Sequence, residues 1–184
     1  MSSTLIGNIS NLVDCNDIIS QCLQHDGETH RGHLKLDPSS IAYDSYITQT
    51  KMATDAGYDK NGAIEFRHFK PGKHFDNEFV NTFANYVSAT PIVTFISEIK
   101  PGYMAPWHWD IDPFEDENAK KGEIIRFHMH LSKPEPGHVF ILEDQVFYNI
   151  PQGNVYHWHN IKAWHAGTNC GMVPKYLFSF KGYR

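Results

Sequence analysis

The second half of the chain is a succession of short strand-like segments, and this pattern limits the possible folds most strongly. Each segment is rich in β-branched and aromatic residues, and turn residues such as Pro101-Gly102 separate one segment from the next. The expected strands are Ile92–Ile99, Trp107–Ile111, Glu123–Leu131, Val139–Leu142, Val146–Ile150, Val155–His159 and Tyr176–Phe180. Many short strands of this kind are typical of a sandwich or barrel. Residues 91–184 are therefore expected to form a β core.

Helical patterns are confined to the first half of the chain. Residues 16–24 predict a short amphipathic helix, with Asp14 or Asn16 as its N-terminal cap. Residues 77–88 predict a second helix, because their apolar side chains recur with the helical period and Asp76 can cap the start.

The segment between these helices is less informative. Residues 26–62 are polar and rich in turn residues, with weak strand candidates around Leu34 and over Ile41–Ile47. We therefore expect residues 1–90 to give helical and irregular support to the β core, all in one domain of 184 residues. The predicted fold class is mainly β with flanking helices (α+β), built on a double-stranded β-helix, or jelly roll.

Composition excludes several classes of protein. Hydrophobic residues make up 41% of the chain and aromatic residues 14%, which argues against disorder. The formal net charge of −5 gives no footprint for nucleic acid. Three cysteines (Cys15, Cys22 and Cys170) cannot all pair, which suits a reducing compartment. With no signal-peptide pattern and no long apolar run, we expect a soluble cytoplasmic protein that neither enters a membrane nor binds nucleic acid. The sequence sets no oligomeric state.

Two short motifs predict a metal site. In the first, His108 and Asp110 are two residues apart, so in a strand both side chains reach the same face. The second motif supplies His165, in the run Trp-His-Ala-Gly-Thr-Asn. Two imidazoles and one carboxylate with open coordination positions form the facial triad of a non-haem Fe(II) oxygenase. We therefore predict His108, Asp110 and His165 as metal ligands and catalytic residues.

The spacing of the first motif is weak evidence alone, because His74-Phe75-Asp76 repeats it. Lys175 distinguishes the His165 frame from the others, because it follows His165 by ten residues. The other candidate distal histidines have no cationic residue ten positions further on. A cation there is suited to holding the far carboxylate of 2-oxoglutarate. His74 and Asp76 are better explained as a loop residue and a helix cap.

The segment Glu123–Leu131 adds a polar face. Arg126, His128 and His130 alternate with apolar residues, so they share one side of the expected strand. In an open sheet this side would meet solvent. In a barrel it would line the cavity, with donors placed for a dicarboxylate. Solvent faces usually carry Lys, Glu and Thr, so the second interpretation is favoured.

These residues resemble the Fe(II)/2-oxoglutarate-dependent oxygenase superfamily over about residues 92–181. The His-x-Asp…His frame with Lys175 resembles the prolyl-4-hydroxylase branch. Arg126-x-His128 resembles the aspartyl/asparaginyl β-hydroxylase branch, whose enzymes lack the metal carboxylate and use arginine where Lys175 stands. The resemblance implies that His108, Asp110 and His165 bind iron, that Lys175 binds the distal carboxylate, and that Arg126 and His128 help to hold the cosubstrate.

The activity implied by the resemblance is that of a dioxygenase. Fe(II), 2-oxoglutarate and O2 would be required, with ascorbate as a candidate reductant, and succinate and CO2 would be released. The hydroxylase branches and the retained Asp110 favour hydroxylation of a C–H bond over halogenation. The substrate is a peptidyl residue, an amino acid or a small metabolite. The acidic loop 112–118, which is either a lid or a solvated loop, favours a neutral or basic one.

Two other functions stay open on the residues alone. A jelly-roll cupin enzyme would use its metal without 2-oxoglutarate, and the pairs His128-x-His130 and His157-x-His159 are typical of such sites. A binding protein with incidental histidines is the non-enzymatic alternative. All four tryptophans (107, 109, 158 and 164) flank the proposed ligands. Most are expected to be core aromatics, with at least one forming a wall of the pocket.

Overall fold

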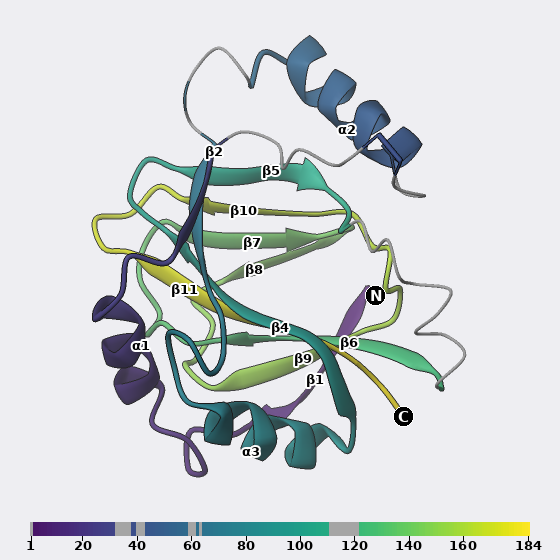
Figure 1. The fold of residues 1–184 in the computed structure, drawn as a ribbon. Helices are drawn as coiled ribbons and strands as arrows, with labels where there is room; N and C mark the ends of the chain where they lie inside the picture. The colour runs from purple at the N-terminus through teal and green to yellow at the C-terminus, as the bar shows by residue number, and fades with distance from the viewer. Residues whose placement is uncertain (1, 32–37, 40–42, 59–61, 63, 111–121) are drawn as a thin grey trace.

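The strands form two layers that face each other, as the computed structural model shows (Figure 1). The structure describes residues 2–31, 38–39, 43–58, 62, 64–110 and 122–184. Within these residues, eleven strands form two antiparallel sheets. The major sheet has the order β1 (Ser3–Asn8), β9 (Asn154–Trp158), β6 (Ile124–His130), β11 (Lys175–Tyr183), β4 (Thr90–Ile99), β3 (Glu65–Phe69) and β2 (Glu28–Arg31). The minor sheet has the order β5 (Met104–His108), β10 (His165–Asn169), β7 (His138–Leu142) and β8 (Gln145–Tyr148). The predicted jelly roll is confirmed.

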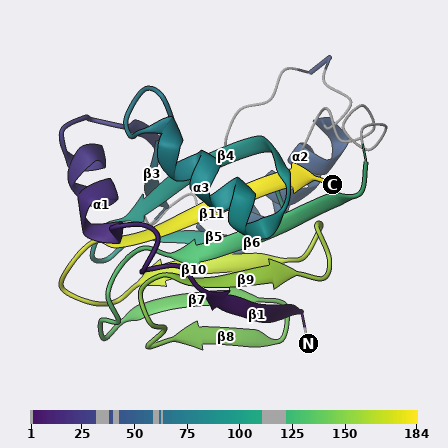
Figure 2. The ribbon, with the colours of Figure 1, turned by 90° about the horizontal axis from the view of Figure 1, so that it is seen from below.

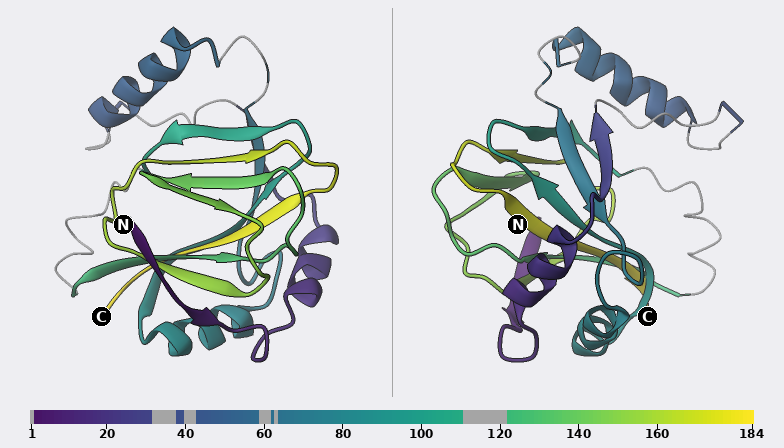
Figure 3. Two further views of the ribbon diagram at one scale, coloured as in Figure 1. Left: turned by 180° about the vertical axis from the view of Figure 1, so that it is seen from behind. Right: turned by 60° about the vertical axis from the view of Figure 1, so that its left-hand side comes forward.

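The helices flank this core. They are α1 (Cys15–Leu23), α2 (Tyr43–Asp55) and α3 (Asn77–Val87). Figure 2 shows α1 and α3 across the outer face of the major sheet. Figure 3 shows α2 beyond the β5 edge of the minor sheet. Among the described helices, none is long and apolar enough to cross a membrane.

The outer face of the major sheet carries the larger apolar core. Phe178 of β11 is fully buried, and its ring centroid lies 4.7 Å from that of Phe79 and 4.9 Å from that of Phe83, both on α3. Phe127 and Met129 of β6 join the same core. The helical period predicted for residues 77–88 thus matches the face that α3 buries against the sheet.

The inner face of the major sheet carries the polar side of β6. Arg126, His128 and His130 are buried, and they lie opposite Lys181, Ser179 and Leu177 of β11. A smaller apolar core fills part of the space between the sheets. Its members are Phe140, Leu142, Phe147, Trp158, Ala163 and Leu177. The polar side chains of β6 therefore face the interior, and the alternative of a solvated polar face is wrong.

Both predicted helices form, but only one of them has the predicted side-chain cap at its N-terminus. The Asp14 side chain caps α1, accepting hydrogen bonds from the backbone amides of Asn16 at 2.9 Å and Asp17 at 3.2 Å. Asp76 stands at the cap position of α3, but its side chain makes no capping hydrogen bond. Packing of the apolar face therefore stabilises α3 without the predicted cap.

One predicted strand is wrong. The weak strand over Ile41–Ile47 falls largely in α2, a helix that begins at Tyr43. The helix buries Gln49 and Ala53, which are four residues apart, while Ile47 stays exposed. The strand propensity of this short segment was outweighed by the burial of one face of the helix. Leu34, the other weak strand candidate, lies outside the described residues.

The ends of the other predicted strands agree with the structure to within a few residues. The shift that bears on the site is that of β5, which runs over Met104–His108 in place of the predicted Trp107–Ile111. Asp110 therefore lies beyond the end of the strand, and Ile111 and the loop 112–118 lie outside the described residues. Four strands were not predicted, namely β1, β2, β3 and β10.

Replacing Phe178 with alanine tests the join between α3 and the major sheet. The change removes a fully buried ring, so Phe178→Ala should lower the free energy of unfolding by about 3–5 kcal/mol. Chemical denaturation measures this value. Tyr148→Ala on β8 is the control, because that side chain is 70% exposed and its loss should change stability by less than about 0.5 kcal/mol. Equal effects of the two substitutions would contradict the assigned core.

Candidate metal centre

The pairing of β10 with β5 brings the two predicted histidine ligands together. In this antiparallel register His165 stands opposite His108, and the two imidazole ring centroids are 4.2 Å apart. Residues directly opposite each other in an antiparallel pair share one face of the sheet. Both rings therefore point into the space between the sheets.

Asp110 completes the group from the chain that follows β5. Its Oδ1 atom lies 3.5 Å from Nε2 of His108 and 3.7 Å from Nε2 of His165. One donor atom from each of the three residues lies within 4.8 Å of the others. Asp110 is 37% exposed and the two histidines are less exposed, so the group opens to solvent on the aspartate side.

Both imidazoles are held in the tautomer that metal binding requires. Nδ1–H of His108 donates to the carbonyl of Pro106 at 2.5 Å, and Nδ1–H of His165 donates to the carbonyl of Ala163 at 3.0 Å. Nε2 of each ring therefore has a free lone pair directed at Asp110. Burial lowers the pKa of both histidines, which keeps the rings neutral and able to ligate.

The rival histidine pairs do not form such a group. Among the described residues, His108, Asp110 and His165 are the one set of three potential ligands that converge. His74 is a loop residue whose Nδ1 accepts the backbone amide of Lys70 at 2.8 Å. His159 is exposed and shares a hydrogen bond with Thr4 at 2.7 Å. A ligand set built on these histidines therefore has no support in the fold.

Lys175 lies buried in the same interior. It is 3% exposed, and its Nζ donates to the carbonyl of Val139 at 2.5 Å. Burial lowers the pKa of Lys175 to about 7. Among the described residues no carboxylate pairs with this amine, so a charged Lys175 has an uncompensated charge that an anion would neutralise.

Gly167 brings the backbone of β10 close to Lys175. It follows His165 by two residues on β10, and both residues are buried. A Cβ atom at Gly167 would lie 3.6 Å from Nζ of Lys175 and 3.1 Å from Cδ1 of Ile99. The strand is therefore packed closely against these side chains, and a residue larger than glycine would crowd them. Gly167 was not among the predicted site residues, although a small residue two positions after a ligand was a readable signal.

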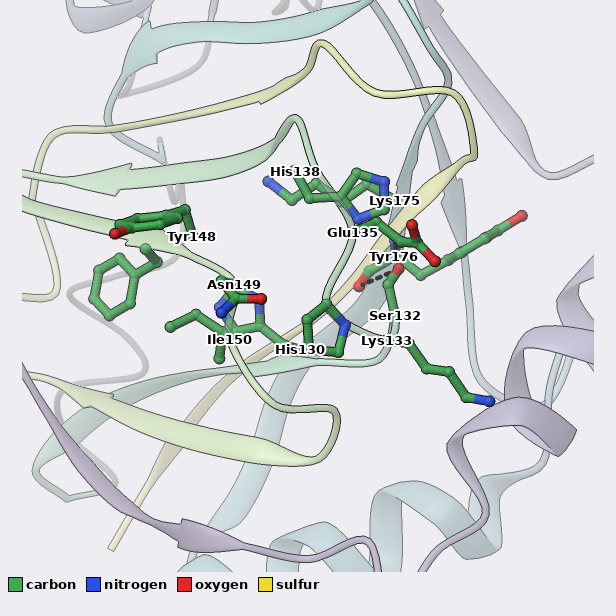
Figure 4. A pocket seen from close by; sticks show the side chains of 12 residues that line it. His130, Ser132, Lys133, Glu135, His138, Tyr148, Asn149, Ile150, Lys175 and Tyr176 are labelled. Atoms are coloured by element: carbon green, nitrogen blue, oxygen red, sulfur yellow. Dashed lines mark hydrogen bonds between the residues drawn. The ribbon is translucent and has the colours of Figure 1, made fainter.

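A small polar pocket lies on the far side of Lys175 from the metal ligands. Figure 4 shows His130, His138 and Lys175 among the side chains around it. His138 pairs with Asn169, at the opposite end of β10 from His165. The polar residues of β6 thus run from the triad, beside Arg126, to this pocket, beside His130.

Trp158 connects the remaining predicted residues. Its Nε1–H donates to Nδ1 of His128 at 2.6 Å, and the Arg126 guanidinium lies 4.0 Å from its ring centroid. Because Nδ1 of His128 accepts, the proton of this neutral ring is on Nε2, which is buried and finds no hydrogen-bond partner among the described residues. Arg126 forms an ion pair with Asp110. Trp158 was expected only as one of four tryptophans near the ligands, and its contacts with both His128 and Arg126 were not predicted.

Comparisons with known proteins give similarity at the level of solved structures. No family model and no curated protein matches the sequence. A viral collagen prolyl hydroxylase from Paramecium Bursaria Chlorella virus-1, in a 2OG complex, is 13% identical with a TM-score of 0.48, over 89% of this chain and 99% of that one. A Pseudomonas putida prolyl-4-hydroxylase is 11% identical with a TM-score of 0.41, over 92% and 99%. A 2OG-Fe(II) oxygenase family oxidoreductase from Burkholderia pseudomallei is 15% identical with a TM-score of 0.42, over 94% and 92%.

Identities and scores this low carry no functional inference. The fold and the converging side chains by themselves define a jelly-roll protein with a His-Asp-His group between its sheets. Any assignment of activity rests on the geometry of that group and of Lys175.

Replacing Lys175 with methionine should stabilise the protein in a pH-dependent way. The pKa of Lys175 is about 7 in the fold and 10.5 as an unperturbed side chain. Below pH 7 both folded and unfolded chains hold the proton, so the fold bears the full penalty of a buried charge. Between pH 7 and about 10.5 only the unfolded chain keeps the proton, and the penalty falls as pH rises.

The expected result for Lys175→Met is a gain in unfolding free energy on the order of a few kcal/mol at pH 6, shrinking steadily towards pH 10. Denaturation of both proteins at a series of pH values measures the difference. A gain that is constant across this range would show that Lys175 keeps an ordinary pKa in the fold.

Proposed function

We propose that this chain is an Fe(II)- and 2-oxoglutarate-dependent dioxygenase. It hydroxylates a C–H bond of a peptidyl residue, an amino acid or a small metabolite, with release of succinate and CO2. The observation that carries the proposal is a His-Asp-His group between the same two sheets that bury an amine lacking a counter-ion among the described residues. That combination suits a metal and a dicarboxylate bound side by side.

The donor set fits ferrous iron. Two neutral imidazoles and one carboxylate, with open positions beside them, are the ligands of non-haem Fe(II) oxygenases. His108, Asp110 and His165 would hold the metal through Nε2, Oδ1 and Nε2. When bound, the iron supplies O2 activation coupled to oxidative decarboxylation of 2-oxoglutarate.

The interior also fits the cosubstrate. Gly167 lies two positions beyond His165 on β10, a rise of about 6.6 Å, which a five-carbon dicarboxylate spans. Lys175, whose Nζ lies near Gly167, would bind the far carboxylate by charge pairing. Nε2–H of His128, which is buried without a hydrogen-bond partner among the described residues, would donate to the cosubstrate. The predicted contact of Arg126 with the cosubstrate stays a prediction, because the contacts of its guanidinium are with Asp110, Trp158 and Ile161.

Succinate formation tests the proposed class. The full chain is incubated with Fe(II), 2-oxoglutarate, ascorbate and O2, and turnover without the prime substrate is followed as succinate. His165→Ala should reduce succinate to the background level, because one metal ligand is lost. His159→Ala is the matched control: it removes an exposed histidine that bonds Thr4, and should leave succinate unchanged.

The same mixture without O2 gives a second measurement. A weak visible charge-transfer band is expected when Fe(II) and 2-oxoglutarate bind at one open site. Absence of both succinate and this band in the wild-type protein would favour a cupin enzyme or a binding protein. Equal succinate from wild type and His165→Ala would remove the triad assignment.

The role of Lys175 has its own test. Lys175→Met should weaken 2-oxoglutarate binding by about 10- to 100-fold, since one charge-assisted hydrogen bond is lost. Metal binding should be unchanged. Titration of the charge-transfer band measures both.

Pyruvate serves as the control ligand, because it keeps the 2-oxo acid group and lacks the far carboxylate. Its affinity should be the same in wild type and Lys175→Met. Gly167→Ala offers a second variant that keeps the amine and places a methyl group beside it, and it should weaken 2-oxoglutarate in the same selective way. Loss of pyruvate and 2-oxoglutarate together would place Lys175 outside the far-carboxylate site.

A further inference from the structure

The two carboxylate oxygens of Asp110 have different partners. Oδ1 faces Nε2 of His108 and Nε2 of His165, at 3.5 and 3.7 Å. Oδ2 is paired with Nη2 of Arg126. One oxygen is therefore directed at the position where the histidine lone pairs meet, and the other is turned away from it.

Arg126 is anchored by contacts other than Asp110. Its guanidinium lies over the Trp158 ring at 4.0 Å, and its Nη1 donates to the carbonyl of Ile161 at 3.4 Å. Trp158 is itself fixed by the hydrogen bond to His128 and by an edge contact with the His165 ring, whose centroid is 4.9 Å away. With Arg126 only 5% exposed, this support places the guanidinium at a fixed position beside the metal ligands.

Carboxylates bind metal ions through one oxygen or through both. A facial triad leaves three coordination positions open when each ligand supplies one atom. A 2-oxo acid that chelated the metal would need two of these positions and would leave one for O2. If Asp110 bound through both oxygens, one of these positions would be lost.

We propose that Arg126 is a positioning residue that keeps Asp110 a one-oxygen ligand by holding Oδ2. This inference rests on the proposed function, and it assigns to Arg126 a part in metal geometry that differs from direct contact with the cosubstrate. Arginine suits the task because its planar guanidinium is charged at neutral pH and offers several donors in a fixed plane. Its positive charge also opposes a nearby metal ion, so Arg126 does not strengthen metal binding.

The test uses Co(II) as a visible spectroscopic probe in the metal-free full chain. Wild type, Arg126→Met and Arg126→Lys are titrated with Co(II) first and with 2-oxoglutarate afterwards. For Arg126→Met we expect Co(II) binding at least as tight as in wild type, and a ligand-field spectrum that differs before any cosubstrate is added. Affinity for 2-oxoglutarate should then fall at least tenfold. Arg126→Lys keeps a cationic donor and should return the spectrum towards that of wild type.

The spectrum of the Co(II) protein without cosubstrate is decisive. Identical spectra for wild type and Arg126→Met, with 2-oxoglutarate weakened, would overturn the proposal and make Arg126 a direct cosubstrate contact. Weaker Co(II) binding in Arg126→Met would also overturn it, because the arginine would then be needed to present the carboxylate at all. Thermal unfolding of the metal-free variants checks that each is folded. Failure of the wild-type protein to bind Co(II) would instead remove the proposed function.

Discussion

The register between β5 and β10 is the constraint on which the site depends. It sets His165 opposite His108, so strand pairing alone brings together two ligands from distant parts of the chain. The same strand pairs on its other side with β7, which supplies the Val139 carbonyl to Lys175. Gly167, two residues beyond His165, then lies beside the amine. The central strand β10 therefore sets His165 opposite His108 and lies against the buried Lys175, and a slip of one residue in its pairing would turn His165 away from the interior.

The interior is built to be polar, although it lies between two sheets. On the outer face of the major sheet, phenylalanines of β11 pack against α3 and give the fold an apolar core of its own. The inner face can then carry Arg126, His128 and His130 without leaving the sheet unsupported. Nε2 of His128 and Nε2 of His130 are buried there without a hydrogen-bond partner in the described part of the chain. Such groups lower stability unless a ligand satisfies them, and buried groups of this kind are typical of a binding site.

The sequence predicted those parts of the site that depend on local spacing. Alternation along β6 indicated which side chains share a face, and the fold turned that face inward. The strand β10 escaped prediction because His-Ala-Gly-Thr-Asn holds a single β-branched residue and no bulky apolar one, and its glycine lets the backbone lie close to Lys175. The contact between Arg126 and Asp110 could not be predicted from the sequence either. Asp110 lies past the end of β5, and no periodicity describes the direction of a side chain there.

A divalent metal and a dicarboxylate would add no net charge to the interior if they were bound together. Without ligands, Asp110 and Arg126 neutralise each other, and Lys175 is held near neutrality by burial. A divalent cation alone would add two positive charges beside a buried arginine. A dicarboxylate alone would bring two negative charges, and Lys175 would offset them only by taking up a proton. Bound together, the two ligands carry no net charge, and the far carboxylate then stabilises a protonated Lys175. The arrangement therefore favours coupled binding, in which each ligand lowers the electrostatic penalty of admitting the other.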